Sequence, residues 1–392
     1  MKVAVIHDWL VTYGGADRVL EQILVCFPEA DLFSVVDFLP PDQRGFIFNR
    51  PVKTSFIQHL PFARKSFRKY FALTPLAVEQ FDLSAYDLVI SNSHSVAKGI
   101  ITGPDQIHIC YCHSPARWAW EFQHQYLEES GLHKGFLTWP IRWLLHRARM
   151  WDLRTANGVD EFVANSHFIA RRIWKVYRRE ATVIYPPVDV DSFVLHEKKE
   201  DFYLTVSRLV PYKKVKLIVE AFAQMPGKKL VVIGDGPQYE SIKTVAKKNV
   251  EMLGFQSSAV VRQYMQGARA FVFAAEEDFG ICAAEAQACG TPVIAFGKGG
   301  VREIVRGPDN GEATGMFFHE QTCEAVVEAV HRFERDATHF DAAACRRNVS
   351  RFSAERFRAE FMGFCERIRA KHRDETALTS ENSTQRNDER VI

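Results

Sequence analysis

The stretch EDFGICAAEAQACGTPVIA, residues 277–295, divides into a loop, a short helix and a strand. The apolar run Ala270 to Ala275 precedes it and predicts a buried parallel strand. The Ala-rich helix should end at Gly290, because a proline follows at position 292 and cannot continue it. The run Pro292 to Phe296 is apolar again and predicts a second strand. This order of elements predicts a parallel, doubly wound α/β sheet.

The start of this helix predicts an anion-binding site. The amide groups of a first helical turn have no partner inside the helix and carry the positive end of its dipole, so they can face a phosphate. The candidate ligand-binding positions here are Asp278, Phe279, Gly280 and Ile281.

Two glutamates flank this helix start, and their spacing excludes one kind of chemistry. Glu277 and Glu285 are eight residues apart, which on a helix axis is roughly 12 Å. They therefore do not share one proton as a catalytic pair, and they suit the two ends of one long ligand. Glu277 is placed to reach sugar hydroxyls, and Glu285 to accept hydrogen bonds from a ribose diol. The alternative is an acid at a helix N-terminus plus a solvated glutamate.

Length and composition limit the class of protein. The 392 residues suggest two domains, and 47% hydrophobic with 25% charged residues is typical of a globular protein. A net charge of +2 argues against a general nucleic-acid binder. The eight cysteines lie mostly in apolar runs, which indicates reduced thiols and a cytoplasmic protein. No apolar run approaches the roughly 20 residues that span a bilayer, and no signal peptide is recognised.

Strands and helices alternate in both halves of the chain, and this predicts two doubly wound domains. The stiff segment YPPVDVD, residues 185–191, separates them, and we interpret its two aspartates as part of a turn that binds no metal. The expected boundaries are residues 1–186 for the first domain, 187–352 for the second, 353–372 for an amphipathic helix and 373–392 for a disordered tail.

Further candidates follow expected strands, where doubly wound sheets bind ligands. Arg208 and Lys213 follow the first strand of the second domain and are suited to a diphosphate, although basic residues at strand ends are usually solvated. Gly14 and Gly15 follow the first strand of the chain and suit close approach to phosphate or an ordinary tight turn. His113 also ends an apolar strand, where a purely structural histidine is the alternative.

The stretch at residues 277–295 closely resembles the E-x7-E motif of glycosyltransferase family 4, whose members are retaining GT-B enzymes that use nucleotide sugars. Both glutamates, the Phe-Gly pair and the tail from Glu285 to Gly-Thr-Pro-Val are present. The resemblance extends over most of residues 1–370. It implies the GT-B fold, with two Rossmann-like domains facing a central cleft, and a terminal helix that crosses back to the first domain.

The family's site residues transfer to matching positions in this chain. The resemblance implies that Glu277, Arg208, Lys213 and His113 serve catalysis, without a metal or a protein nucleophile. It implies acceptor contacts for Arg117 and Trp118. It implies donor contacts for Glu285, Gly14, Gly15, Asp278, Phe279, Gly280, Ile281, Gly234, Asn165 and Ser166. Relatives carry Glu where this chain has Asp17, so we assign no catalytic role to Asp17.

The segments HDWL, residues 7–10, and CHSPARW, residues 112–118, are similar to those of bacterial polysaccharide mannosyltransferases. GDP-mannose is therefore the favoured donor, ahead of UDP-sugars, and the expected acceptor is a saccharide or lipid-linked glycan. Basic residues alternate with aromatic ones in residues 62–71 and 139–151, which suits either an anionic membrane surface or helices packed on their own sheet. A sugar-nucleotide epimerase of the same fold and a non-catalytic subunit of a polysaccharide assembly complex remain alternative functions.

Overall fold

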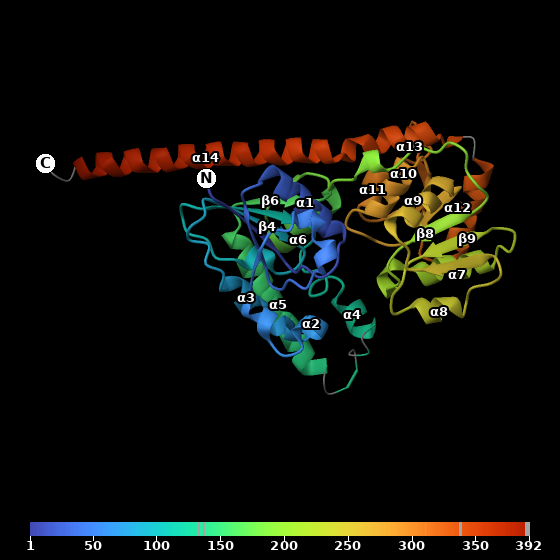
Figure 1. Cartoon of the computed structure of the whole chain (residues 1–392), viewed down its shortest axis with the longest axis horizontal. Helices are drawn as coiled ribbons and strands as arrows, with labels where there is room; N and C mark the ends of the chain where they lie inside the picture. The colour runs from blue at the N-terminus through green and yellow to red at the C-terminus, as the bar shows by residue number, and fades with distance from the viewer. Residues whose placement is uncertain (130, 132–133, 136–137, 310, 337–338, 389–392) are drawn as a thin grey trace. The chain divides into compact units, whose positions relative to one another are not determined.

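A computed structural model describes the chain except residues 130, 132–133, 136–137, 310, 337–338 and 389–392, with the backbone alone described at residues 129 and 375–388. The chain divides into two compact units. Unit 1 comprises Met1–Asn165, Ile169–Ile184 and Phe357–Ile392, and unit 2 comprises Ser166–Phe168 and Tyr185–Arg356. Figure 1 shows both units and labels their helices and some of their strands.

The described residues of unit 1 form a seven-stranded parallel sheet in the order β3-β2-β1-β4-β5-β6-β7. Its strands are β1 Val3–His7, β2 Asp31–Ser34, β3 Val52–Thr54, β4 Leu88–Ser93, β5 Ile107–Cys112, β6 Glu161–Ala164 and β7 Ala181–Val183. The central strands are buried along their whole length, as expected when helices cover both faces of a parallel sheet. The strand order reverses between β1 and β4, which pair directly with His7 opposite Asn92.

The helices of unit 1 connect these strands. They are α1 Gly15–Cys26, α2 Ala63–Ser66, α3 Thr74–Glu79, α4 Gln123–Glu129, α5 Thr138–Thr155 and α6 His167–Tyr177, and helix α14, Ala354–Asp388, follows unit 2 in the chain. The first two residues of α6 and the first three of α14 cluster with unit 2. In helix α1 the side chain of Asp17 accepts a hydrogen bond from the Gly14 amide and closes the first turn.

Unit 2 contains a six-stranded parallel sheet, in the order β10-β9-β8-β11-β12-β13 over its described residues. The strands are β8 Tyr203–Val206, β9 Leu230–Ile233, β10 Val250–Gly254, β11 Ala270–Phe273, β12 Val293–Phe296 and β13 Gly315–Phe318. The helices are α7 Val215–Ala223, α8 Tyr239–Lys243, α9 Ser258–Gly267, α10 Ile281–Ala288, α11 Val301–Ile304, α12 Cys323–Arg335 and α13 Ala342–Val349. The order reverses between β8 and β11, which are neighbours. Both units therefore confirm the predicted doubly wound fold class.

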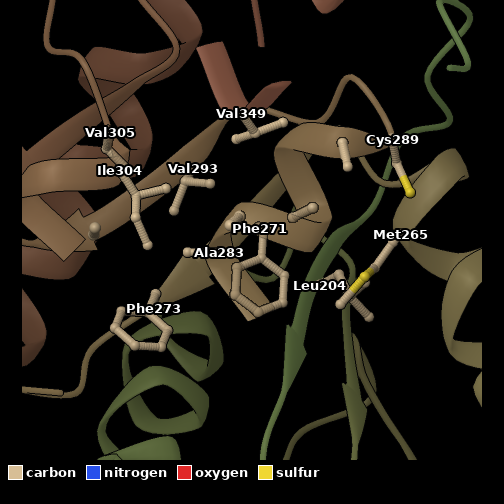
Figure 2. Close-up of a cluster of buried hydrophobic side chains, with 14 of the residues drawn as sticks. Leu204, Met265, Phe271, Phe273, Ala283, Cys289, Val293, Ile304, Val305 and Val349 are labelled. Carbon is tan, nitrogen blue, oxygen red and sulfur yellow. The ribbon is translucent and has the colours of Figure 1, made fainter. Parts of the chain in front are cut away.

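The core of unit 2 explains why the Ala-rich helix α10 lies close to its sheet. Ala283 of α10 packs among Phe271 and Phe273 of β11 and Val293 of β12, all of them buried (Figure 2). Small side chains let the helix approach the strands closely. The helix ends as predicted, since Gly290 adopts the left-handed conformation with φ 75°.

The chain's last helix belongs mainly to unit 1. Phe357, Phe361 and Phe364 of α14 are buried in the same cluster as β1 residues such as Val5. The helix continues through residues 373–388, for which the sequence predicts disorder. Residues 389–392 of the predicted tail lie outside the described residues.

Candidate functional site

The polar residues singled out in unit 2 follow β8 and β11, the two strands between which the sheet order reverses. Arg208 and Lys213 lie on the segment between β8 and α7, and Glu277 lies between β11 and α10. A doubly wound sheet binds its ligands outside the carboxyl ends of its strands at this point of reversal. The topology thus brings together candidates that are 64 residues apart in the chain.

Lys213 and Glu277 form an ion pair between the Lys213 Nζ and the Glu277 Oε1. Both side chains are mostly buried, with exposed fractions of 19% and 17%. Burial disfavours the charged ammonium, but the neighbouring Glu277 carboxylate outweighs it and holds the pKa of Lys213 above its ordinary value. Lys213 is therefore a fixed cation at the carboxyl edge of the sheet.

Two glycines hold the backbone that carries Glu277. Gly300 donates its amide to the Glu277 carbonyl at 2.8 Å, and Gly299 forms a parallel bridge with Glu277. Gly299 has φ 87°, and a Cβ there would lie 2.5 Å from the Glu277 carbonyl oxygen. A Cβ at Gly300 would lie 2.3 Å from the carbonyl oxygen of Asp278. Only glycine allows this close approach, so the pair fixes the position of the loop.

The start of α10 is formed by Gly280, which has φ 102° and precedes the first helical residue, Ile281. Phe279 beside it is buried against Phe352, with ring centroids 5.2 Å apart. Glu285 is also buried, which excludes the alternative of a solvated surface glutamate. The contact of Glu285 with the donor stays a prediction.

A glycine loop after β9 supports the segment that carries Arg208. Gly234 has φ 139°, and a Cβ there would lie 1.8 Å from the Ser207 carbonyl oxygen. Backbone hydrogen bonds join the two loops, from Ser207 to Ile233 at 3.0 Å and from Leu209 to Asp235 at 2.9 Å. Arg208 itself is exposed, and no carboxylate pairs with it in the part of the chain that the structure describes.

Asn165 and Ser166 are both buried, and each bonds to the chain's own backbone. In unit 1, Asn165 Nδ2 donates to the carbonyl oxygen of His113 at 3.1 Å. In unit 2, Ser166 Oγ donates to the carbonyl oxygen of Asp278 at 2.6 Å. The contacts that these bonds make within the chain position His113 and Asp278, and the donor contacts of Asn165 and Ser166 stay predictions.

In unit 1, His113 belongs to a buried network at the carboxyl edge of β1, β4 and β5. Its Nε2 lies 2.6 Å from Asn92 Oδ1, and Asn92 Nδ2 lies 3.0 Å from His7 Nδ1. His7 Nε2 is 3.3 Å from Asp17 Oδ1, and Asp17 Oδ2 accepts the amide of Gly14 at 2.9 Å. Asp17 thus has a structural role. The amide of Gly14 donates its hydrogen bond to Asp17. A Cβ at Gly15, in contrast, would have no atom within 4 Å.

The same edge contains a pair that sequence reasoning missed, Asp8 and His94. Asp8 follows β1 and is fully buried, and its Oδ2 lies 2.8 Å from Nδ1 of His94, which follows β4. One signal in the sequence could have indicated each residue, because Asp8 and His94 each follow an apolar strand directly, in HDW at residues 7–9 and in NSHS at residues 92–95. These two segments are far apart in the sequence, so nothing in the pattern joins them.

The two predicted acceptor residues are half-buried on the segment after β5. The Arg117 guanidinium lies 5.7 Å from the centre of the Phe122 ring. The Trp118 ring contacts Phe71 edge-on, with centroids 4.6 Å apart. Both side chains therefore rest on aromatic neighbours of unit 1, and their acceptor contacts stay predictions.

Two family models match the chain and meet at the boundary between the units. The model described as Glycosyltransferase Family 4 matches residues 13–192, and the model described as Glycosyl transferases group 1 matches residues 189–350.

Curated relatives match about half of the chain. An uncharacterized glycosyltransferase of Methanocaldococcus jannaschii is 32% identical over 180 residues, which are 45% of this chain and 51% of that protein. The human GDP-Man:Man(3)GlcNAc(2)-PP-Dol alpha-1,2-mannosyltransferase is 27% identical over 241 residues, 53% of this chain and 49% of that protein. The chain thus spans about half of the length of these relatives.

A solved structure matches nearly the whole chain. The crystal structure of Anabaena Alr3699/HepE in complex with UDP-glucose has a TM-score of 0.65 and 17% identity, and the match covers 93% of this chain and 100% of that one. At this identity, the likeness shows a shared fold.

Proposed function

We propose, on the premise that this chain is a glycosyltransferase family 4-like protein with the GT-B fold, that it transfers a hexose from a nucleotide diphosphate sugar to a saccharide or lipid-linked glycan. The observation that carries the proposal is the Lys213–Glu277 ion pair at the reversal of the unit 2 sheet. It combines a fixed cation for a diphosphate with an acid for sugar hydroxyls.

The proposed mechanism assigns a separate task to each group of unit 2. Lys213, Arg208 and the first amides of α10 stabilise the negative charge that grows on the departing diphosphate. Glu277 orients the sugar ring, and Glu285 binds the ribose diol of the nucleotide. The bond between the anomeric carbon and the phosphate oxygen breaks as the acceptor oxygen bonds on the same face. The acceptor's proton passes to that phosphate oxygen, so configuration is retained without a metal or a protein nucleophile.

The tasks of unit 1 are proposed separately. Asn92 and Asn165 fix the ring and backbone of His113, which suits a histidine that orients a sugar hydroxyl. Arg117 and Trp118 supply a cation and an aromatic face to the acceptor. Open space at Gly15 is compatible with close approach of a phosphate to the backbone.

GDP-mannose is the first candidate donor, and UDP-sugars follow. Similarity to a human enzyme whose name includes GDP-Man supports GDP-mannose, and similarity to the UDP-glucose complex of Alr3699/HepE supports UDP-sugars.

Thermal unfolding with a panel of nucleotide sugars tests the proposal, since a ligand at a hundredfold excess over its Kd stabilises the native state by about 2.7 kcal/mol. Stabilisation by GDP-mannose that is lost in Lys213→Ala is expected. A folded protein that responds to no nucleotide sugar would contradict it.

A second assay separates transfer from the alternative activities. GDP-mannose incubated with the protein alone should stay intact, and adding a glycan acceptor should release GDP together with a glycosylated product. An epimer formed from the donor alone would instead indicate a sugar-nucleotide epimerase. Tight binding of the donor with no turnover on any glycan would indicate a non-catalytic subunit.

We also propose that α5 binds an anionic membrane, as suits a lipid-linked acceptor. Trp139 and Trp143 are 77% and 63% exposed, although Trp151 on the same helix is packed against the core. The exposed face of α5 carries Arg142, Arg147 and Arg154, and its single acidic residue, Asp152, is buried. Exposed tryptophans among arginines favour the membrane interface. None of the described helices is long and apolar enough to span a bilayer.

Helix α5 has a basic neighbour in the same unit. Glu79 at the end of α3 accepts hydrogen bonds from Trp151 and Arg154 of α5, so the two helices lie side by side (Figure 1). The segment that leads into α3 carries Phe62, which is 82% exposed, together with the exposed residues Arg64, Lys65, Arg68 and Lys69. Both basic aromatic segments found in the sequence therefore belong to one side of unit 1.

A further inference from the structure

The pair Asp8–His94 lies at the reversal point of the unit 1 sheet, as Lys213–Glu277 does in unit 2. Asp8 directly follows β1, and His94 directly follows β4, the two neighbouring strands between which the order changes. This is the position where a doubly wound sheet binds a ligand. The predicted site residues of unit 1 do not include either residue.

The Asp8 carboxylate is built into the backbone. It is fully buried and accepts four amide hydrogen bonds, from residues 94 to 97, at 2.6–3.0 Å. Burial opposes ionisation, but His94 and these bonds outweigh it and hold the pKa of Asp8 well below its ordinary value. Asp8 is thus ionised, held in place by the backbone and inaccessible to solvent.

His94 is the solvent-facing member of the pair. Its side chain is 32% exposed, and Nδ1 faces Asp8. The Trp9 ring meets the imidazole edge-on at 4.7 Å between centroids, while His7 and His113 lie 6.2 and 6.5 Å away. Burial lowers the pKa of His94, but the Asp8 carboxylate outweighs burial and raises it above the ordinary value. The imidazole therefore favours its charged form.

Besides Asp8, two charged residues act on His94, namely Asp17 and Arg117. Asp17 raises its pKa and Arg117 lowers it, so both lie within electrostatic reach. Asp17 is almost wholly buried and is paired with His7 and the Gly14 amide. Arg117 is half-buried on the segment after β5. The two carboxylates near His94 are thus buried, whereas the side chain of His94 is partly exposed.

We propose that His94, held by Asp8, is a binding site for an anionic oxygen group, of the phosphate or sulfate type, on a substrate. A buried carboxylate at Nδ1 of a partly exposed imidazolium holds that N–H inwards, leaves the Nε2–H as the other donor and keeps the ring charged. The proposal rests on the proposed transferase function, because that function supplies two such groups. One is the diphosphate of the donor, and the other is a phosphate on the acceptor, such as that of a lipid-linked glycan.

Inorganic sulfate is the probe, because its charge is constant where His94 titrates, whereas a phosphate monoester titrates near pH 6. Histidine ring resonances of the full-length protein are followed by NMR against pH, with and without sulfate. Sulfate should raise the apparent pKa of His94, because it binds the charged form more tightly. His94→Gln should weaken sulfate binding by about tenfold or more, which is about 1.4 kcal/mol. The exposed His59 of the same unit gives the control His59→Gln, which should bind sulfate as the native chain does.

Two arms identify the source of the anion. If saturating GDP abolishes the effect of sulfate on His94, the site serves the donor diphosphate. If the effect persists, the site serves the acceptor. A His94 resonance that responds to neither sulfate nor GDP, or a His94→Gln variant that is folded and binds sulfate normally, would overturn the proposal. Failure of the transferase proposal would appear separately, as loss of nucleotide-sugar stabilisation while the sulfate response of His94 remains.

Discussion

The ammonium of Lys213 and the carboxylate of Glu277 meet across two neighbouring strands of unit 2, although they are 64 residues apart in the chain. In the proposed reaction, one binds the diphosphate and the other binds the sugar. Because the two side chains are paired, the loss of either one also changes the electrostatic environment of the other.

The first prediction concerns this pair. Lys213→Ala and Glu277→Ala should each reduce transfer by about 100-fold or more, as removal of one preorganised electrostatic group does elsewhere. Their effects should not add in the double variant, since the partner of each is already lost. Steady-state kinetics with saturating acceptor measures this. The matched pair Lys216 and Glu220 of α7 is more exposed, so alanine there should leave transfer unchanged. Full activity in purified Lys213→Ala or Glu277→Ala would contradict the proposed role of the pair in transfer.

The second prediction concerns Gly299, whose φ of 87° and close contact with the Glu277 carbonyl leave no room for a side chain. Gly299→Ala should destabilise the protein by about 1–3 kcal/mol through strain and should weaken donor binding by displacing the Glu277 loop. Thermal unfolding with and without GDP-mannose measures both. The control is Gly227→Ala in the same unit, where a Cβ meets nothing within 4 Å. Equal stability of the two variants would contradict this explanation of Gly299.

The third prediction concerns the buried carboxylate of Asp8. Asp8→Asn replaces one of its oxygens with an NH2 group, which faces amide donors that it cannot satisfy. Leaving such donors and the His94 charge without a partner should cost about 3–5 kcal/mol. Chemical denaturation followed by circular dichroism measures the loss. Asp105→Asn, at an exposed position of the same unit, should be close to neutral, and similar stability of both variants would argue against a central role for Asp8.

The fourth prediction concerns pH. Because the pKa of His94 is raised in the folded protein, its pairing with Asp8 stabilises the fold fully below about pH 6.5, the ordinary histidine value, and this stabilisation is lost as pH rises through the folded pKa. The difference in melting temperature between the native chain and His94→Gln should therefore be largest at acidic pH and should shrink on the alkaline side. A difference that grows with pH would show that the imidazole is held neutral.

The fifth prediction concerns α5. Arg142→Gln and Arg147→Gln should each weaken binding to vesicles of phosphatidylcholine and phosphatidylglycerol by about 1 kcal/mol, the typical contribution of one basic residue near an anionic surface. The double variant of Trp139 and Trp143 to Ser should also lose binding, by removing the apolar contacts. Vesicle co-sedimentation measures both effects. Trp174→Ser on α6 is the matched control at an exposed tryptophan. Binding that is insensitive to anionic lipid would contradict the proposal.

The sequence predicted the elements of unit 2 well, because its strands are continuous apolar runs and its turns carry glycine. The strands Ala270–Phe273 and Val293–Phe296 lie within the apolar runs 270–275 and 292–296 that predict them. The strand Val52–Thr54 was missed, since three residues at the edge of a sheet carry no run of buried apolar side chains. The burial of Glu285 was also not decided by the sequence, which leaves a helical glutamate free to face either way.

The amino-acid sequence by itself determined the doubly wound fold and the strand ends that carry charged residues, because local apolar runs and glycine turns act over a few residues. Only the tertiary structure decided which of these residues meet. The pairs Lys213–Glu277 and Asp8–His94 exist because the strand order reverses between β8 and β11 and between β1 and β4. Strand order depends on long-range packing of the whole sheet, and no local pattern of residues records it.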